Sequence, residues 1–112
     1  MRLDESTFIK VHDSFHNVST PGQAFPVVLS QVTDKAIITV TAPEATQNWY
    51  TAGYLKQYWK DGAFSSVLVS RTKLPLAVPF LVNLEPVNNC LLNFEPVEWI
   101  GTFFLTVEIR SL

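Results

Sequence analysis

The chain has 112 residues, which is enough for one domain with a single buried core, and we treat residues 1–112 as one β-rich domain. Its formal net charge is -2 and its Lys and Arg residues form no cluster, which argues against the basic surface that nucleic-acid binding requires. Only 16% of the residues are charged, against about 25% in an average soluble protein, so either uncharged polar side chains cover the surface or an assembly hides part of it.

The N-terminal third of the chain predicts one strand followed by a hairpin. Residues 6–12 (STFIKVH) favour a short strand, and the turn-forming residues in 17–23 (NVSTPGQ) join it to the next segment. In residues 25–42 (FPVVLSQVTDKAIITVTA), two apolar runs flank a four-residue turn, which would place Leu29 beside Ile38. We therefore expect residues 25–42 to form an antiparallel hairpin.

The aromatic segment 46–62 (TQNWYTAGYLKQYWKDG) is compatible with two structures. As a helix, it would align its tyrosines, which recur every fourth residue. As a strand, it would lead into a hairpin turn at Asp61-Gly62 and place Trp59 opposite Phe64. The Asp-Gly pair favours the hairpin, and a short helical turn near Asn48 could precede it.

The C-terminal half predicts further strands. Residues 65–72 and 76–85 are rich in apolar and β-branched residues. In residues 102–110 apolar residues recur at every second position, which is typical of a half-buried strand. Pro79 lacks a backbone N–H, so the strand that contains it is expected at a sheet edge or at a bulge.

Residues 81–87 (LVNLEPV) return as residues 91–97 (LLNFEPV). If the two copies form a hairpin, with Leu84 opposite Phe94, then their like faces stay together. Two copies are too few for a repeat architecture, so we interpret the similarity as strand pairing. Together these segments predict an all-β fold, an antiparallel sandwich or jelly-roll-like barrel of about seven short strands.

The stretch HDSFH is the most obvious candidate for chemistry, because His12 and His16 are spaced by four residues. The predicted strand ends here, and the chain has no further histidine and a single cysteine, Cys90. His12 and His16 are therefore weak metal candidates, and we expect no metal, no cofactor and no catalytic site.

The predicted interaction surface combines the aromatic segment with the edge strand. Large aromatic side chains bury more area than other residues and act as core or interface anchors, whereas on an exposed face they can stack on sugar rings. The candidate interface residues, which are also sugar-binding residues in that alternative, are Trp49, Tyr50, Tyr54, Tyr58, Trp59, Phe80, Val82 and Leu84.

These features predict a non-enzymatic structural protein. We expect it to act by protein–protein contacts as a homo-oligomer or with other subunits, for example in a virion (phage capsid or tail), and a carbohydrate-binding module is the alternative. The first residues (MRLDESTF) lack an apolar segment, and no apolar run reaches the roughly 20 residues of a membrane helix. The expected location is therefore the cytoplasm, where the chain is made, or a virion, without membrane or nucleic-acid partners.

Overall fold

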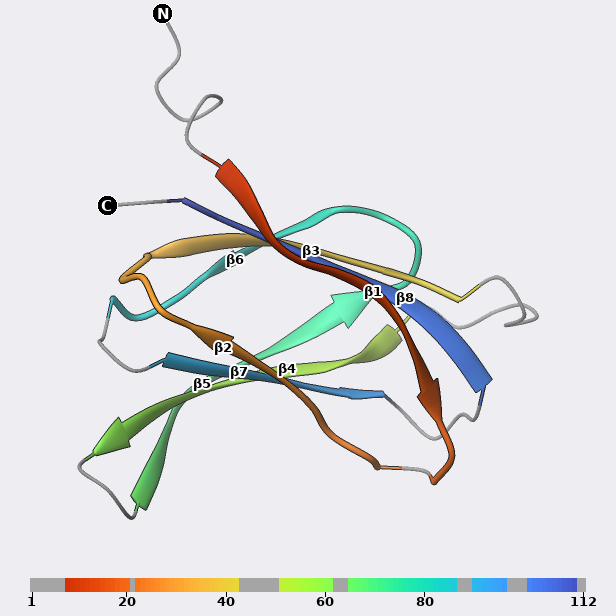
Figure 1. Cartoon of the computed structure of the whole chain (residues 1–112), viewed down its shortest axis with the longest axis horizontal. Helices are drawn as coiled ribbons and strands as arrows, with labels where there is room; N and C mark the ends of the chain where they lie inside the picture. Colours follow the sequence, from red (N-terminus) through yellow and green to blue (C-terminus); the bar gives the residue numbers. More distant parts are fainter. Residues whose placement is uncertain are drawn as a thin grey trace, which may run out of the picture.

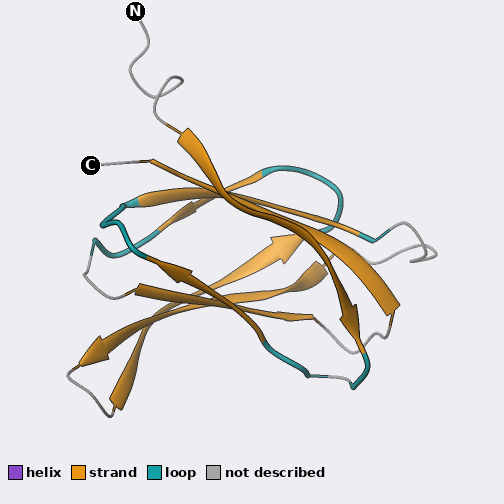
Figure 2. Cartoon of the chain, viewed as in Figure 1, coloured by secondary structure: helices purple, strands orange, loops and turns teal. Residues whose placement is uncertain are grey.

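The computed structural model describes residues 8–20, 22–42, 51–61, 65–86, 90–96 and 101–110. This part of the chain consists of strands and their connections (Figure 2). Its eight strands are β1 (Phe8–Val18), β2 (Phe25–Leu29), β3 (Lys35–Thr41), β4 (Thr51–Asp61), β5 (Ser65–Pro75), β6 (Phe80–Asn83), β7 (Cys90–Pro96) and β8 (Gly101–Arg110). The all-β prediction is confirmed, with eight strands instead of seven.

The strands form two antiparallel sheets that pack face to face. Sheet A has the order β1-β8-β3-β6, and sheet B has the order β2-β7-β4-β5. Figure 1 shows sheet A above sheet B, so the predicted sandwich is confirmed. Within the ranges given above there is no helix, and accordingly no helical segment long and apolar enough to cross a membrane.

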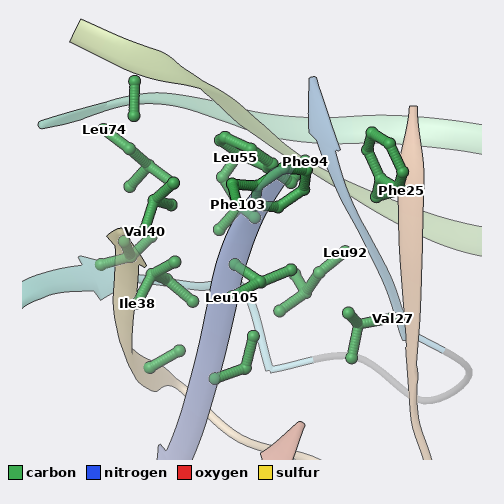
Figure 3. Packing of buried hydrophobic residues seen from close by; sticks show 14 of the residues in the cluster. Phe25, Val27, Ile38, Val40, Leu55, Leu74, Leu92, Phe94, Phe103 and Leu105 are labelled. Carbon is green, nitrogen blue, oxygen red and sulfur yellow. The ribbon is translucent and has the colours of Figure 1, made fainter. Parts of the chain in front are cut away.

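The core between the sheets is formed by apolar side chains at every second position of the strands. In β8, Phe103, Leu105, Val107 and Ile109 are almost completely buried, as the sequence pattern predicts. Phe94 of β7 meets Phe103 of β8 with ring centroids 5.3 Å apart (Figure 3). These contacts join the middle strands of the two sheets.

The predicted hairpin of residues 25–42 is wrong, because β2 and β3 belong to different sheets. β2 pairs with β7, and β3 pairs with β8 and β6. The connection is fixed to sheet A: the Thr33 hydroxyl donates to the carbonyl of Arg110, and Asp34 forms a two-bond ion pair with the Arg110 guanidinium. Both strands still turn their apolar faces to one core, which is why their pattern resembled a hairpin.

The hairpin predicted between the two similar segments is also wrong. β6 lies at one edge of sheet A, whereas β7 lies inside sheet B between β2 and β4. In both copies the same apolar positions are buried, namely Val82 and Leu84 in the first copy and Leu92 and Phe94 in the second. The repeat therefore reflects two strands that face one core from opposite sheets.

The predicted hairpin of the aromatic segment is confirmed, since β4 pairs with β5, and the helical alternative for residues 51–61 is wrong. The register differs from the expected one: Trp59 lies opposite Val67 instead of Phe64. A three-residue connection separates Asp61 from Ser65, in place of a two-residue turn, and bulges at Thr51/Gly53 and Gln57/Tyr58 shift the pairing further along β4. The helical turn predicted near Asn48 lies outside the described residues.

Two further expectations concern the edges of sheet A. Pro79 directly precedes β6, which is an edge strand as predicted. β1 is longer than expected and continues through HDSFH to Val18, so His12 and His16 lie within a strand and not at its end. A bulge between Lys10 and His12 shifts the pairing of β1 with β8.

Candidate functional site

The β6 edge, which we define by Val78, Phe80 and Leu81, exposes apolar side chains beside an open strand. These side chains are 49%, 36% and 52% exposed, respectively. Leu81 lies opposite Ile37 on the outer face of sheet A, and Phe80 lies opposite the buried Ile38 at the rim of the core. β6 pairs with β3, and no strand of the described part pairs with its other side. The β6 edge thus combines apolar surface with a backbone side that another strand can complete.

The structure divides the predicted interface residues of this region. Phe80 reaches the surface, but Val82 and Leu84 are only 2% and 6% exposed and belong to the core. The Leu84 N–H also donates to the Asp34 carbonyl at 2.8 Å, which fixes this segment to the connection between the sheets. Val82 and Leu84 therefore support the edge from inside the core, and their side chains are not exposed in the single chain.

The aromatic candidates of β4 lie on two faces. Tyr54 and Tyr58 are half-buried on the outer face of sheet B, opposite Glu95 and Leu91 of β7. Trp59 lies opposite the buried Cys90, toward the other face. Trp49 and Tyr50 lie outside the described residues.

One face of the Tyr54 ring is already occupied. The Arg71 guanidinium carbon of β5 lies 3.9 Å from the ring centroid, a cation–π contact. Next to it, Lys56 and Glu95 form an ion pair of 3.0 Å. The outer face of sheet B is therefore a mixed aromatic and charged surface in which the Arg71 guanidinium covers one face of the Tyr54 ring.

His12 and His16 come together on the inner face of β1. Their Nε2 atoms are 2.8 Å apart, the ring planes differ by 11°, and the ring centroids are 5.0 Å apart. The centroid separation is nearly the Nε2 separation plus the two ring radii, so the two nitrogens face each other directly. The Ser14 hydroxyl lies 3.3 Å from Nε2 of His12 and 3.4 Å from Nε2 of His16.

This arrangement fits a shared proton better than a shared metal ion. Two imidazoles on one tetrahedral zinc point toward a common third position with donor atoms about 3.4 Å apart, whereas these nitrogens point at each other across 2.8 Å. Among the residues whose placement is described, no third His, Cys, Asp or Glu completes a metal-binding group. We therefore treat His12 and His16 as a hydrogen-bonded pair and not as metal ligands.

The same contacts do not make Ser14 a nucleophile. Its distances to the two imidazoles are at the long end for hydrogen bonds. A general base needs a free Nε2 lone pair, and here one Nε2 carries the hydrogen of the shared hydrogen bond while the lone pair of the other accepts it. The described geometry thus gives Ser14 a supporting contact to the pair.

The single cysteine is enclosed in the core. Cys90 is buried on β7, and burial raises the pKa of its thiol, although the Gln57 amide donates to Sγ at 3.3 Å. A protonated thiol is a poor nucleophile and a poor metal ligand. Cys90 therefore acts as a small apolar side chain.

Sequence reasoning missed two surface features near β1. Phe15 is 64% exposed on the outer face of sheet A and meets Phe104 edge to face at 4.7 Å. A pocket of about 250 Å³ lies at the end of the sandwich and is lined by Val11, Val28, Leu29, Ser30, Gln31 and Ile109. It is smaller than the roughly 300–1,000 Å³ of typical small-molecule sites. Phe15 lies in the part of β1 beyond His12, where the sequence predicts no strand. The pocket combines residues of β1, β8 and the end of β2, which no single segment of the sequence brings together.

No protein-family model matches this chain, and no curated protein is significantly similar to it in sequence. Function is therefore inferred from the surfaces and side-chain clusters described above.

Proposed function

We propose that this chain is a non-enzymatic assembly subunit that binds a second copy, or another protein subunit, through the β6 edge. The observation that carries the proposal is the coincidence of an open strand side with the exposed side chains of Val78, Phe80 and Leu81. Addition of a strand there supplies backbone hydrogen bonds, and burial of the side chains supplies affinity.

The energetic argument favours a protein partner. Exposed apolar surface gains about 25 cal/mol for each Å² removed from water, and β6 carries few charges that would oppose burial. Lys35 of the neighbouring strand is already engaged by the Asn83 amide oxygen at 2.8 Å. A virion capsid or tail is one assembly in which a small β-sandwich with 16% charged residues could serve in this way.

Size-exclusion chromatography with light scattering, over a hundredfold range of concentration, tests self-association. The wild-type mass should exceed that of the 12.6 kDa monomer and rise with concentration. Leu81→Lys should return the protein to a monomer, because a lysine on the outer face of β6 must be desolvated in the interface. The matched control is Phe15→Lys, the same change at an exposed apolar residue of the opposite edge strand of sheet A.

Two results would count against this proposal. A wild-type monomer at every concentration removes self-association and leaves only a different protein as partner. Assembly that survives Leu81→Lys but is lost with Phe15→Lys assigns the contact to the β1 side of the sheet.

Carbohydrate binding is a second candidate, favoured by the position of Tyr54 and Tyr58 outside the core on one face of β4. Ring stacking on a sugar needs an accessible ring face. A glycan array should then show a binder whose signal is lost in Tyr58→Ala. The contact of Arg71 with Tyr54 reduces the available area, which makes this candidate the weaker one.

A further inference from the structure

The inner face of β1 contains a polar cluster where the core is otherwise apolar. In the β1–β8 ladder, His12, Ser14 and His16 lie opposite Val107, Leu105 and Phe103, which are all buried. Side chains directly opposite each other in an antiparallel pair share a face. The two imidazoles thus lie against the core at the edge of sheet A.

His16 also connects the two sheets. Its ring lies 5.3 Å from that of Phe103 on β8 and 5.2 Å from that of Phe25 on β2, centroid to centroid. Phe25 and Phe103 themselves meet edge to face at 5.0 Å, and both are visible in Figure 3. β1 is one edge strand of sheet A and β2 is one edge strand of sheet B, so this contact closes one side of the sandwich.

The contact between the two Nε2 atoms tolerates only certain protonation states. A hydrogen bond between them needs a proton on one Nε2 atom and a lone pair on the other Nε2 atom to accept it. The neutral pair and the singly charged pair both satisfy this requirement. When both imidazoles are charged, two N–H groups face each other at 2.8 Å and the contact cannot persist.

Among the described residues, the surroundings of the pair do not compensate a second charge. In the described parts of β2 and β8, the groups that face the pair are the apolar side chains Phe25, Phe103, Leu105 and Val107. The nearby charged groups of β1 and β8 lie on the outer face: Lys10 pairs with Asp13 at 3.3 Å, and Glu108 lies opposite Lys10 in the ladder. Burial first, and then the charge of His12, lower the pKa of His16 below its usual value.

We propose that the His12–His16 pair is an acid-sensitive closure that holds β1 on the sandwich while it carries at most one extra proton and releases β1 when it takes up the second. In the unfolded chain each histidine takes up a proton below the ordinary histidine pKa of about 6.5. In the closed state the pair can take up only one of these two protons. The closure is therefore fully effective above this pH and is weakened as the pH falls below it.

Amide hydrogen exchange, corrected for the intrinsic pH dependence of exchange, tests this proposal at pH 7.5 and pH 5.5. Protection in the β1–β8 ladder should fall on acidification, by up to tenfold per pH unit for one excluded proton. The β4–β7 ladder is the internal control and should change less. His12 and His16 are the only histidines of the chain, so few other groups titrate in this range.

The variant His12→Leu/His16→Phe should remove the pH dependence, because it replaces the titrating pair by apolar side chains. Asp13→Asn, on the outer face between them, should retain it. A wild-type ladder with equal protection at both pH values, or a double variant with the wild-type response, would overturn the proposal.

A measurement on the wild type keeps the test valid if the double variant does not fold. Nitrogen chemical shifts of the imidazoles, followed through a pH titration, should show two separate protonation steps, the second one coinciding with the loss of β1 protection. Two independent titrations at the ordinary histidine pKa would refute the shared-proton arrangement.

Discussion

Gln57 is the side chain whose replacement tests the packing of the sandwich most directly. It is 1% exposed, and its Nε2 donates to the Glu85 carbonyl at 2.8 Å while its Oε1 accepts from the Glu85 N–H at 2.9 Å. One amide from β4 in sheet B thus fixes the segment that follows β6 in sheet A. Replacement by leucine keeps the approximate volume but leaves both Glu85 backbone groups without this partner.

The expected loss follows from those two bonds. A buried polar group that loses its partner costs about 1–3 kcal/mol, but Glu85 is an exposed residue, so water can replace part of each lost bond. We therefore expect Gln57→Leu to lower the free energy of unfolding by about 1–3 kcal/mol. The matched control is Gln31→Leu, the same change at an exposed position, which should stay within about 0.5 kcal/mol of wild type.

Urea unfolding followed by circular dichroism measures both values. The stability of the variant Gln57→Glu should depend on pH. Its carboxylate would face the Glu85 carbonyl without a proton to donate, whereas the protonated acid can donate a hydrogen bond to that carbonyl. Burial raises the pKa of such a carboxyl, so this variant should gain stability, relative to wild type, as the pH falls from 8 to 5. A Gln57→Leu protein within 0.5 kcal/mol of wild type would refute the proposed role of the amide.

Three further predictions use other contacts of the described chain. A Cβ at Gly53 would overlap backbone atoms of β7, so Gly53→Ala should lower the free energy of unfolding in urea by about 3 kcal/mol. A Cβ at Gly22 would meet no atom, but Gly22 has φ +85°, so Gly22→Ala should lower it by only about 1 kcal/mol. Because Cys90 is buried with a raised pKa, a thiol reagent should modify it more than about a hundredfold slower in the native than in the unfolded protein. The Arg110 hydrogen bond lowers the pKa of Asp34, so the stability that this ion pair contributes should be lost as the pH falls through the range in which carboxyl groups are protonated. Thermal melts at a series of pH values test this, and an equal loss of stability in acid for Asp34→Asn would contradict it.

The alternation within strands could be predicted because burial repeats with period two. Residues 102–110 show this clearly, and every apolar position expected on the inner face is buried in β8. The edge position of β6 could also be predicted, since Pro79 lacks the donor that an internal strand needs. These signals are local, and a single segment carries each of them.

Strand pairing could not be predicted in the same way, because distant contacts decide it. Thr33 and Asp34 bond Arg110, which is more than seventy residues away in sequence, and this fixes the crossing from β2 to β3. Gln57 fixes the chain after β6 in a similar way. The local pattern shows only that each strand has an apolar face, and two strands in opposite sheets share this property with two strands of a hairpin.

The sequence indicates the spacing of the two histidines but not the strand that brings them together. His12 and His16 were recognised as a pair, but their polarity ended the predicted strand at residue 12, because an inner face is expected to be apolar. In the strand that actually forms, residues four apart share a face. His12 and His16 are therefore polar residues on the inner face of a strand, and this exception to the apolar pattern is the reason why the sequence does not predict the second half of β1.

Three of the four edge strands of the sandwich, β1, β2 and β6, differ in how they resist pairing with another chain. β1 has a bulge between Lys10 and His12, and β2 carries Pro26, which has no N–H to donate. Such features limit the extension of a sheet at its edges. β6 has only its preceding Pro79 and its short length, and it exposes Phe80 and Leu81. Of these three edges, β6 has the least protection along the strand itself, and this is the physical reason for placing the proposed partner strand at β6.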